Sequence, residues 1–498
     1  MTLRGSLMVC GTASDVGKSR IVAGLCRVLA RQHVSVAPFK AQNMSLNSFV
    51  TSGGHEIARS IANQAFAAGV DPDVAMNPIL LKPSGPRTSQ LIVMGHAIGE
   101  FGQREYPERK PELVAVVGAA LDDVRRRFDV VILEGAGGAA EINLLEGDLV
   151  NLPLARRAAV PALLVGDIER GGVFASIYGT VALLPPELRE PLAGFVINKL
   201  RGDATLLRSG IDELEQRCQL PCVGVLPHLG ELSVDAEDSM NLASSPTTQT
   251  LAEGDVLDVA VIRLPHLSNF TDFDPLLFES GVLLRYVSDP GSLGTPDLII
   301  LPGSKATVND LEWLRARHLD QAIALARTRG SGLLGICAGL QMMGTTIVDG
   351  VESATPTTNG LGVVAATTRF AEQKVTRQRR GVDATGLEVV GYQIHHGHTR
   401  VTGSHRHWFT LEDADDTEGV CEPAQGLWAT SLHGLFDADQ LRTSFLSDVA
   451  RRRDKRFVPT SVAYAARRDA EIDRVADALE RYLDLDLVFQ MITSGELQ

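Results

Sequence analysis

Residues 7–19, which read LMVCGTASDVGKS, decide the fold of the first part of the chain. Four apolar residues predict a short buried strand, and a glycine-rich turn joins it to a helix whose apolar residues recur at helical spacing. The turn follows the phosphate-binding pattern G-x-x-x-x-G-K-[ST], except that its first glycine stands one position early and Thr12 takes its place. Strand, turn and helix together predict a phosphate site in a parallel α/β domain.

Each part of this loop has an expected task at a nucleotide. The ammonium group of Lys18 can reach the terminal phosphates of ATP, and the hydroxyl of Ser19 is placed to ligate Mg²⁺. A second buried strand, at 130–133, ends at Glu134, which is predicted to complete the metal site; its alternative role is that of a helix cap. The other residues expected at ATP are those of the turn: Thr12, Asp15, Val16 and Gly17.

The same alternation of apolar runs and helical stretches occurs twice along the chain. Further strands are expected at 162–165, 194–197 and 223–226, and after a Ser/Thr-rich stretch at 259–263, 283–287, 298–301 and 332–336. A helix is expected from about Asp310, capped by Asn309 and ended by Gly330. We therefore predict two α/β domains, each a mostly parallel sheet flanked by helices, at 1–240 and 256–450, with a linker at 241–255 and a helical tail at 451–498.

The second domain carries a candidate nucleophile at residues 332–341, GLLGICAGLQ. A cysteine between glycines at a strand-to-helix turn has the geometry of a nucleophile elbow, and a helix N-terminus favours the reactive thiolate. The N–H groups of Ala338 and Gly303 are the expected oxyanion donors, and Gln341 is a further candidate for substrate binding. His433, in SLHGLF, is the expected base for Cys337, although His395 and His396 are rival bases or substrate contacts.

Composition limits the class of protein. The chain has 498 residues and a formal charge of −14, which argues against a general nucleic-acid binder or a ligand of anionic membranes. We expect no signal peptide, because the short apolar stretch near residue 7 leads directly into glycines, and no uninterrupted apolar run is long enough for a membrane helix. Six cysteines are too few for a disulfide scaffold, and the Cys218 and Cys222 pair has no match that would make a zinc site. We expect a cytoplasmic protein.

Two resemblances follow from these motifs. The displaced glycine, the GKS string and the EGAGG string at 134–138 resemble dethiobiotin synthetase and its relatives, which use ATP to phosphorylate a carboxylate. The Cys337 and His433 motifs resemble the class I glutamine amidotransferases, in which a Cys–His couple releases ammonia from glutamine. Many members carry a glutamate two residues after the histidine, where this chain has Leu435, so the third partner stays unidentified. Together the resemblances imply a P-loop amide synthetase domain fused to a class I glutamine amidotransferase domain.

Further strings make the resemblance more specific. They are KAQNMSLNS at 40–48, NPILLKP at 77–83, DIERGGVF at 167–174, INKLRGD at 197–203 and RLPHLSNFTDFD at 263–274. With both catalytic motifs they resemble the cobyric acid synthase family. The resemblance implies amidation of the b, d, e and g carboxylates of a corrinoid, adenosylcobyrinic acid a,c-diamide, with ATP and glutamine. The alternatives are a cobyrinic acid a,c-diamide synthase, an amidotransferase for a cell-wall precursor, and a regulatory ATPase with an inactive second domain.

The same resemblance implies roles for six more residues. Asn198 falls where an adenine contact is expected. Glu56 is expected to join Ser19 and Glu134 around Mg²⁺, the alternative being a solvated glutamate on a helix. Four cations are candidates for holding the polyanionic corrinoid, although each is more often a surface charge: Lys40, Lys82, Arg170 and Arg201. The sequence leaves the oligomeric state open.

Overall fold

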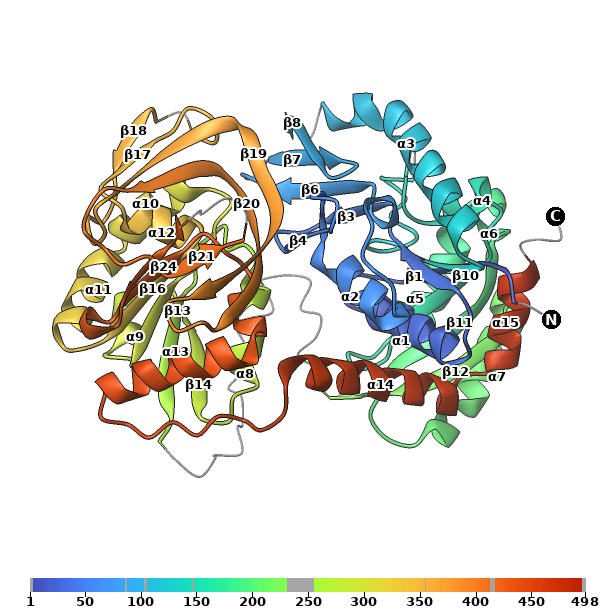
Figure 1. Cartoon of the computed structure of the whole chain (residues 1–498). Coiled ribbons are helices and arrows are strands. Elements are labelled where there is room, and N and C mark those ends of the chain that lie inside the picture. The colour runs from blue at the N-terminus through green and yellow to red at the C-terminus, as the bar shows by residue number, and fades with distance from the viewer. Residues whose placement is uncertain are drawn as a thin grey trace.

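A computed structural model describes residues 3–85, 87–102, 105–145, 147–230, 255–353, 355–412 and 417–494. Two bodies lie side by side, each built on a mainly parallel sheet with helices packed against it (Figure 1). The expected pair of α/β domains is therefore confirmed. Among these residues, no helix is long and apolar enough to cross a membrane. The predicted linker lies outside the described residues except for its last position, Asp255.

The first domain is organised around a six-stranded parallel sheet. Its strands, in spatial order, are β12 (Cys222–Pro227), β11 (Leu192–Leu200), β10 (Ala162–Asp167), β1 (Gly5–Gly11), β9 (Val130–Glu134) and β2 (Val36–Phe39). Alternate residues of β1 enter separate apolar cores: Leu7 and Val9 pack on one face, Met8 and Cys10 on the other. A sheet covered on both faces requires such continuous apolar strands, which is why they could be recognised in the sequence.

Helices cover both faces of this sheet. They are α1 (Lys18–Arg31), α2 (Arg59–Ala68), α3 (Tyr106–Arg127), α4 (Leu152–Arg157), α5 (Val173–Leu183), α6 (Pro186–Arg189) and α7 (Arg208–Cys218), with 3₁₀ turns η1 (Val74–Met76) and η2 (Ala204–Leu207). Two small sheets extend the domain toward its neighbour: β3 (Gln42–Met44), β6 (Ile79–Pro83), β7 (Thr88–Val93) and β8 (His96–Gly102) form one, and β4 (Ser48–Val50) with β5 (Glu56–Ala58) the other.

The second domain has its own sheet and core. Its strands in order are β14 (Val282–Val287), β13 (Leu257–Ile262), β15 (Leu298–Leu301), β16 (Gly332–Ile336), β24 (Leu427–Thr430) and β23 (Val420–Glu422), of which only the last pairing is antiparallel. Its helices are α8 (Asp274–Leu277), α9 (Pro290–Leu293), α10 (Thr307–Ala316), α11 (Leu319–Thr328), α12 (Ala338–Met343) and α13 (Asp439–Arg452), with 3₁₀ turns η4 (Phe270–Phe273), η5 (Pro423–Gln425) and η6 (Leu435–Asp437).

A long antiparallel hairpin joins the two domains. Strands β19 (Ala366–Asp383) and β20 (Glu388–Val401) pair along most of their length and arch toward β4 of the first domain (Figure 1). The same sheet contains β17 (Thr346–Val348), β18 (Thr357–Asn359), β21 (Phe409–Leu411) and β22 (Thr417–Glu418). At the contact, Gln378 of β19 donates a hydrogen bond to the Val50 carbonyl, 2.9 Å away.

One predicted helix differs in detail. The helix expected from Asp310 begins at Thr307, and it breaks into α10 and α11 at His318, whose φ is 59°. Asn309 is therefore inside the helix and not its cap, which corrects the prediction. The turn before α10 is held by Ser304 instead, whose Oγ accepts from the Ala306 N–H at 2.9 Å and donates to Asp310 at 2.6 Å. Gly330, with φ of 99°, follows the second helix as expected.

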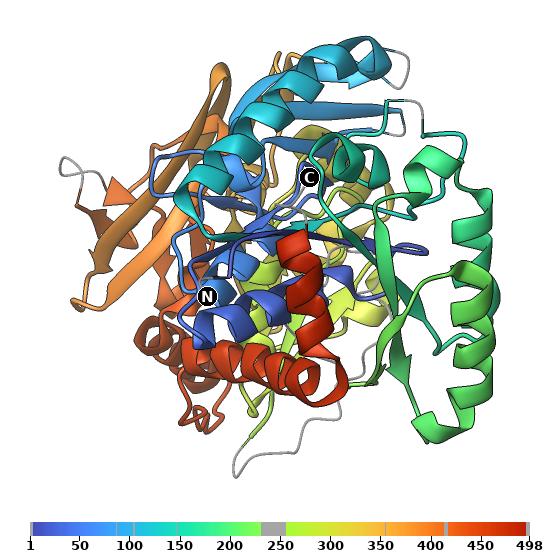
Figure 2. The same ribbon diagram turned by 90° about the vertical axis from the view of Figure 1, so that its right-hand side faces the viewer.

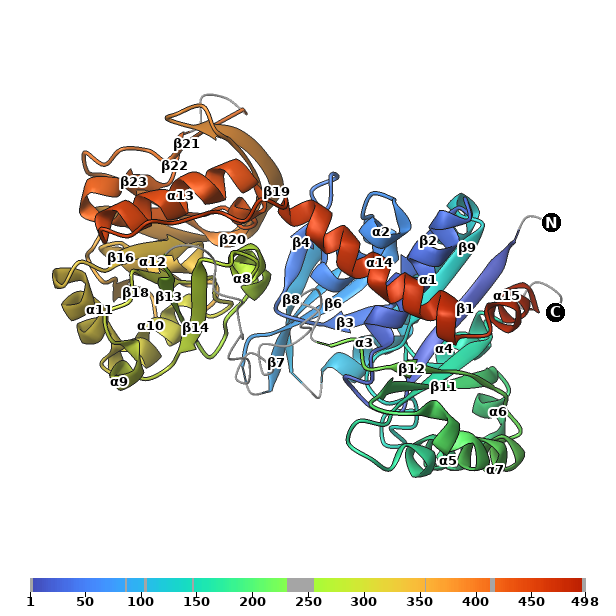
Figure 3. The same cartoon turned by 90° about the horizontal axis from the view of Figure 1, so that it is seen from below.

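The C-terminal residues return to the first domain. Helix α14 (Tyr464–Tyr482) lies along α1, and α15 (Leu485–Ser494) lies beside β1 and β12, as two perpendicular views show (Figures 2 and 3). A Cβ atom added at Gly24 of α1 would lie 2.6 Å from Leu479 Cδ1, so the glycine allows α14 to pack closely. The region expected as a tail after the second domain is thus part of the apolar core of the first.

Candidate active sites

The phosphate-binding loop joins β1 to α1 and is shaped by one glycine. Gly17 has φ of 99°, and a Cβ there would lie 2.3 Å from the Asn198 amide nitrogen. Asn198 Nδ2 donates to the Val16 carbonyl at 2.8 Å, and its Oδ1 accepts from the Lys199 N–H. Asn198 therefore holds the loop from strand β11, which is separated from β1 by β10, a contact that the sequence did not reveal. An adenine contact of Asn198 remains a prediction.

Lys199 also secures the loop. Its ammonium group donates to the Asp15 carbonyl at 2.5 Å and to Asp167 Oδ2 at 2.8 Å. Asp15 itself is exposed and has φ of 58°. Thr12, at the start of the turn, donates its N–H to the Val165 carbonyl of β10 at 2.9 Å. The turn is thus tied to two neighbouring strands, β10 and β11, so its backbone N–H groups are held in place before a phosphate arrives.

Polar side chains gather beside the loop at Glu134, the last residue of β9. The Ser19 hydroxyl donates to Glu134 Oε1 at 2.8 Å, and the Lys40 ammonium contacts the same oxygen at 2.7 Å. Gln64 of α2 donates to the other carboxylate oxygen. Lys18 Nζ donates to the carbonyls of Ala13 and Gly137 at 2.9 and 3.0 Å.

This cluster suits a nucleotide with its cation. A hydroxyl and a carboxylate that touch each other are the oxygen donors with which Mg²⁺ is held alongside substrate phosphates. The chemistry of Ser19 and Glu134 therefore fits Mg²⁺, although Lys40 contacts the same carboxylate oxygen at 2.7 Å, and their role as its ligands stays a prediction. Glu134 is not a helix cap, because the next helix, α4, begins only at Leu152.

Glu56 lies in a different cluster. It is in strand β5 and 1% exposed, so the alternative of a solvated helical glutamate is wrong. Its Oε1 accepts from Lys82 and from Ser48 Oγ, both at 2.8 Å, and its Oε2 accepts from Lys374 of the second domain at 2.5 Å. Burial raises the Glu56 pKa, but Lys374 and Lys82 outweigh burial and hold it well below its usual range. Both oxygens are bound by lysines, so the structure does not bring Glu56 together with Ser19 and Glu134, and its expected role at Mg²⁺ stays a prediction.

The four candidate corrinoid-binding cations fall into two groups. Lys40 and Lys82 are 2% and 4% exposed and are paired with Glu134 and Glu56. Arg170 and Arg201 are exposed and follow strands β10 and β11. Arg201 pairs with Glu169 at 2.8 Å. The structure therefore does not bring the four cations together in one surface, and only the arginines are open to a large substrate.

The nucleophile elbow of the second domain has the expected shape. Cys337 stands between β16 and α12 with φ of 52° and ψ of −104°. A Cβ added at Gly339 would lie 1.9 Å from the Leu301 carbonyl oxygen, so this position needs glycine. Ala338 is the first residue of α12, which is only six residues long. Gly303 follows β15, and a Cβ there would lie 2.9 Å from the His433 ring, which places the strand end at the histidine.

His433 is oriented by Asp272, a partner that sequence reasoning missed. The His433 Nδ1 atom lies 2.7 Å from Asp272 Oδ2, and both side chains are 1% exposed. Asp272 Oδ1 accepts from the Gly434 N–H at 2.8 Å. Burial lowers the pKa of His433, but the Asp272 carboxylate and the Cys337 sulfur outweigh burial and raise it to about 10. Asp272 lies 161 residues from His433 in sequence, in the 263–274 string. It supplies a carboxylate partner for the histidine in a chain that has Leu435 where many class I amidotransferases have a glutamate.

The rival histidines are placed differently. His396 Nδ1 lies 3.0 Å from the Ala371 carbonyl and its Nε2 lies 3.4 Å from Gln90 of the first domain, so both ring nitrogens are engaged away from Cys337. Both ring nitrogens of His395 are buried without a hydrogen-bond partner. Burial lowers the His395 pKa to about 3, which keeps the ring neutral. Neither histidine has a carboxylate hydrogen-bonded to it, as His433 has, so His433 is the better base.

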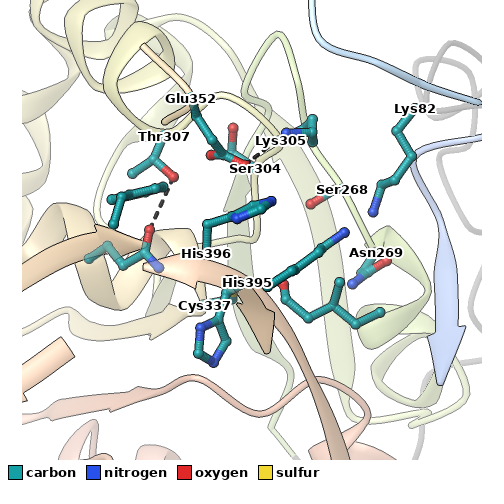
Figure 4. A pocket seen from close by; sticks show the side chains of 14 residues that line it. Lys82, Ser268, Asn269, Ser304, Lys305, Thr307, Cys337, Glu352, His395 and His396 are labelled. Carbon is teal, nitrogen blue, oxygen red and sulfur yellow. Dashed lines mark hydrogen bonds and ion pairs between the residues drawn. The ribbon is translucent and has the colours of Figure 1, made fainter. Parts of the chain in front are cut away.

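A small pocket opens beside Cys337. Figure 4 shows its lining, which includes Gln341, His395, Glu352 and three lysines, Lys82, Lys305 and Lys374. Gln341 Oε1 accepts from Thr307 at 3.1 Å. The pocket thus contains the expected nucleophile and the expected substrate contact, and Lys82 reaches it from the first domain.

Beside this pocket, Ser48 of the first domain is hydrogen-bonded to two residues of the second domain. The Ser48 N–H donates to Asn269 Oδ1 at 2.8 Å, and its carbonyl accepts from the Tyr392 hydroxyl at 3.0 Å. Tyr392 in turn stacks on His433, with ring centres 5.5 Å apart. The segment that follows the Lys40 region therefore touches the residues that support the second catalytic site.

A phosphate-loop domain joined to a domain with a Cys–His–Asp site defines a nucleotide-dependent glutamine amidotransferase. Family models agree: residues 7–242 match the CobQ/CobB/MinD/ParA nucleotide binding domain, and residues 258–441 match the CobB/CobQ-like glutamine amidotransferase domain. The chain is 46% identical to cobyric acid synthase of Nocardia farcinica, over 99% of this chain and 98% of that protein. The chain belongs to the cobyric acid synthase family.

Other relatives agree over the same length. Cobyric acid synthase of Rhodococcus jostii is 47% identical over 99% of this chain and 96% of that protein. Cobyric acid synthase of Klebsiella pneumoniae is 42% identical over 99% of this chain and 98% of that protein. These alignments cover both domains and the C-terminal helices.

Proposed function

We propose that this enzyme amidates the b, d, e and g carboxylates of adenosylcobyrinic acid a,c-diamide, using ATP and ammonia released from glutamine. Family membership over the full chain supports the substrate. The observation that carries the proposal is the pairing in one chain of the Ser19–Glu134–Lys40 cluster with the Cys337–His433–Asp272 cluster. The first fits carboxylate phosphorylation by ATP, and the second fits glutamine hydrolysis.

In the amidotransferase domain, the thiolate of Cys337 attacks the carboxamide carbon of glutamine. The N–H groups of Ala338 and Gly303 stabilise the oxyanion, and His433 donates a proton to the departing ammonia. Water then attacks the thioester while His433 removes its proton, which releases glutamate and restores the thiol. Asp272 stabilises the imidazolium and keeps the proton on Nδ1. Gln341 lies in the same pocket and contacts the substrate.

In the synthetase domain, the corrinoid carboxylate attacks the γ-phosphorus of ATP and forms an acyl phosphate and ADP. Ammonia then attacks the acyl carbon, and phosphate leaves with the bonding electrons. Lys18 and the backbone N–H groups of residues 13–17 offset the charge on the phosphates. Ser19 and Glu134 would hold Mg²⁺, which neutralises phosphate charge when bound.

We expect the corrinoid to approach the synthetase domain at the C-terminal ends of strands β10 and β11. Arg170 and Arg201 remain candidates for its carboxylates, because they are exposed where β10 and β11 end. We place the enzyme in the cytoplasm, because its six cysteines are unpaired, as is usual in a reducing compartment, and because ATP and glutamine are cytoplasmic metabolites.

The experiment is to incubate the enzyme with ATP, glutamine and the a,c-diamide and to follow product mass. Each conversion of a carboxylate to an amide lowers the mass by about one unit, and we expect four such losses. Conversion of cobyrinic acid to its diamide instead would favour the diamide synthase alternative. No mass change with any corrinoid would refute the proposed function.

Two variants separate the half-reactions. We expect Cys337→Ala to abolish glutamine-dependent amidation while ammonium salts still support it, because the synthetase site is unchanged. We expect Lys18→Ala to remove amidation with either nitrogen source, because the acyl phosphate no longer forms. Loss of both activities in folded Cys337→Ala, or retained activity in Lys18→Ala, would contradict the division of labour.

A further inference from the structure

The glutamine pocket contains more positive than negative charge. Three buried lysines line it, and Lys305 is paired with Glu352 at 2.7 Å. The other two, Lys82 and Lys374, share the single carboxylate of Glu56 at 2.8 and 2.5 Å. Three ammonium groups therefore face two carboxylates, and among the described lining residues the only carboxylate that faces the pocket is Glu352.

A buried excess charge is unfavourable unless a ligand compensates it. The effect is visible at Lys374: burial, together with the nearby Lys82 and Lys305, lowers its pKa to about 8 against the opposing effect of Glu56. An anion placed between Lys82 and Lys374 would remove this penalty. The charge distribution therefore favours a ligand whose carboxylate lies between these two lysines, at the end of the pocket away from Cys337.

We propose that Lys82 of the synthetase domain and Lys374 of the amidotransferase domain together bind the α-carboxylate of glutamine. The carboxamide then lies at Cys337, and the α-ammonium group faces Glu352. This inference rests on the proposed glutamine hydrolysis and adds that the glutamine site is completed by the other domain. It assigns Lys82 to glutamine and not to the corrinoid, because Lys82 lines the pocket that contains Cys337.

The position of Lys82 supports this composite site. Lys82 is the last residue but one of strand β6 and also donates to Ser48 Oγ at 3.0 Å. Ser48 is bound by Asn269 and Tyr392 of the second domain, so the lysine is held against the pocket by the domain contact itself. Bound glutamine would therefore contact both domains, and its binding would strengthen their contact.

The test uses Lys82→Met in the full-length enzyme and three amides as substrates. Glutamine has both charged groups, glutaramate lacks the α-amino group, and 4-aminobutanamide lacks the α-carboxylate. Methionine keeps most of the side-chain volume, and Glu56 keeps Lys374 as its partner, so no buried carboxylate is left unpaired. Release of the deamidated acid is measured for each amide, with ammonium-driven amidation as the check that the variant is folded.

We expect Lys82→Met to lower kcat/KM for glutamine and glutaramate by about 10- to 100-fold, the usual effect of losing a hydrogen bond to a charged group. The value for 4-aminobutanamide should stay within about twofold, because this substrate has no carboxylate to lose. Lys374→Met should give the same pattern. Equal losses for all three amides, no loss for any, or a change only in the KM of the corrinoid would overturn the inference. Absence of glutamine hydrolysis in the unmodified enzyme would instead refute the proposed function.

Discussion

The substitution Asp272→Asn tests the site with the least change in shape. Asp272 Oδ1 accepts the Gly434 N–H, and its Oδ2 faces His433 Nδ1. An asparagine can keep the first bond only by placing its oxygen at Gly434, which puts its NH₂ group against His433. The ring nitrogen Nδ1 must then accept a hydrogen bond, so the proton moves to Nε2. That nitrogen can no longer take a proton from Cys337.

The size of the effect follows from two losses. Removing a charged hydrogen-bond partner costs about 1.5–3 kcal/mol, or about 10- to 150-fold in rate. The wrong tautomer costs more, about 10⁴-fold in the corresponding serine triad. We therefore expect glutaminase kcat to fall between about 10²- and 10⁴-fold in Asp272→Asn. Asp272→Ala loses the charge without forcing the tautomer, so its loss should lie nearer the smaller figure.

The assay is glutamate release from glutamine at neutral pH, with Cys337→Ala as the background. Ammonium-driven amidation in the same preparations shows whether the variants are folded, and it should be unchanged because Asp272 lies in the other domain. Without its carboxylate partner, His433 should also titrate lower, since Asp272 is what raises its pKa toward 10. Glutaminase activity of Asp272→Asn within about threefold of the unmodified enzyme would refute the reasoning.

Two further predictions concern stability. Glu56→Gln should destabilise the enzyme at pH 7 by about 3–5 kcal/mol, because it breaks a buried ion cluster. The Glu56 pKa is lower in the folded state, so the stability that its carboxylate contributes is fully present above the unfolded pKa near 4.3. Below that pH, the difference in unfolding free energy between the unmodified enzyme and Glu56→Gln should shrink by roughly 1.4 kcal/mol per pH unit. Thermal melting of both proteins at pH 7 and pH 3 checks this, and a difference independent of pH would contradict it. Leu479→Ala should destabilise the first domain by about 2–5 kcal/mol and lower the melting transition that ATP raises. The control Leu446→Ala should instead lower the melting transition of the second domain. If Leu479→Ala left the ATP-sensitive transition unchanged, α14 would not belong to the first domain.

The two motifs, and the strands that carry them, could be predicted from the local pattern of apolar residues and glycines. The loop at 11–19 and the elbow around Cys337 are turns between a buried strand and a helix, so apolar runs and glycines within one short stretch specify them. The helices α14 and α15 could be expected from their spacing, but not their place. A helix with one apolar face packs wherever a complementary groove exists, and the groove here is made by Gly24 of α1.

Side-chain partners across domains could not be predicted in this way. Glu56 and Lys374 are 318 residues apart, and only the arch of β19 brings them together. From sequence alone, a carboxylate after a glycine-rich turn is as well suited to a metal as to a lysine. The same holds for Asp272. Leu435 indicated that the usual glutamate partner of the histidine is absent, but the sequence did not show which distant carboxylate replaces it.

Residues 40–48 connect the nucleotide site to the glutamine pocket and therefore limit the distance between them. Lys40 contacts Glu134 at the nucleotide site, and Ser48 contacts Glu56 and Lys82 at the glutamine pocket. Eight residue steps of fully extended chain span at most roughly 28 Å, so this is an upper limit on the separation of these two anchors. We expect a displacement of Lys40 on phosphate binding to affect Ser48, which is hydrogen-bonded to Asn269 and Tyr392. Nucleotide binding and the geometry around His433 should therefore be coupled, because one short piece of backbone belongs to both sites.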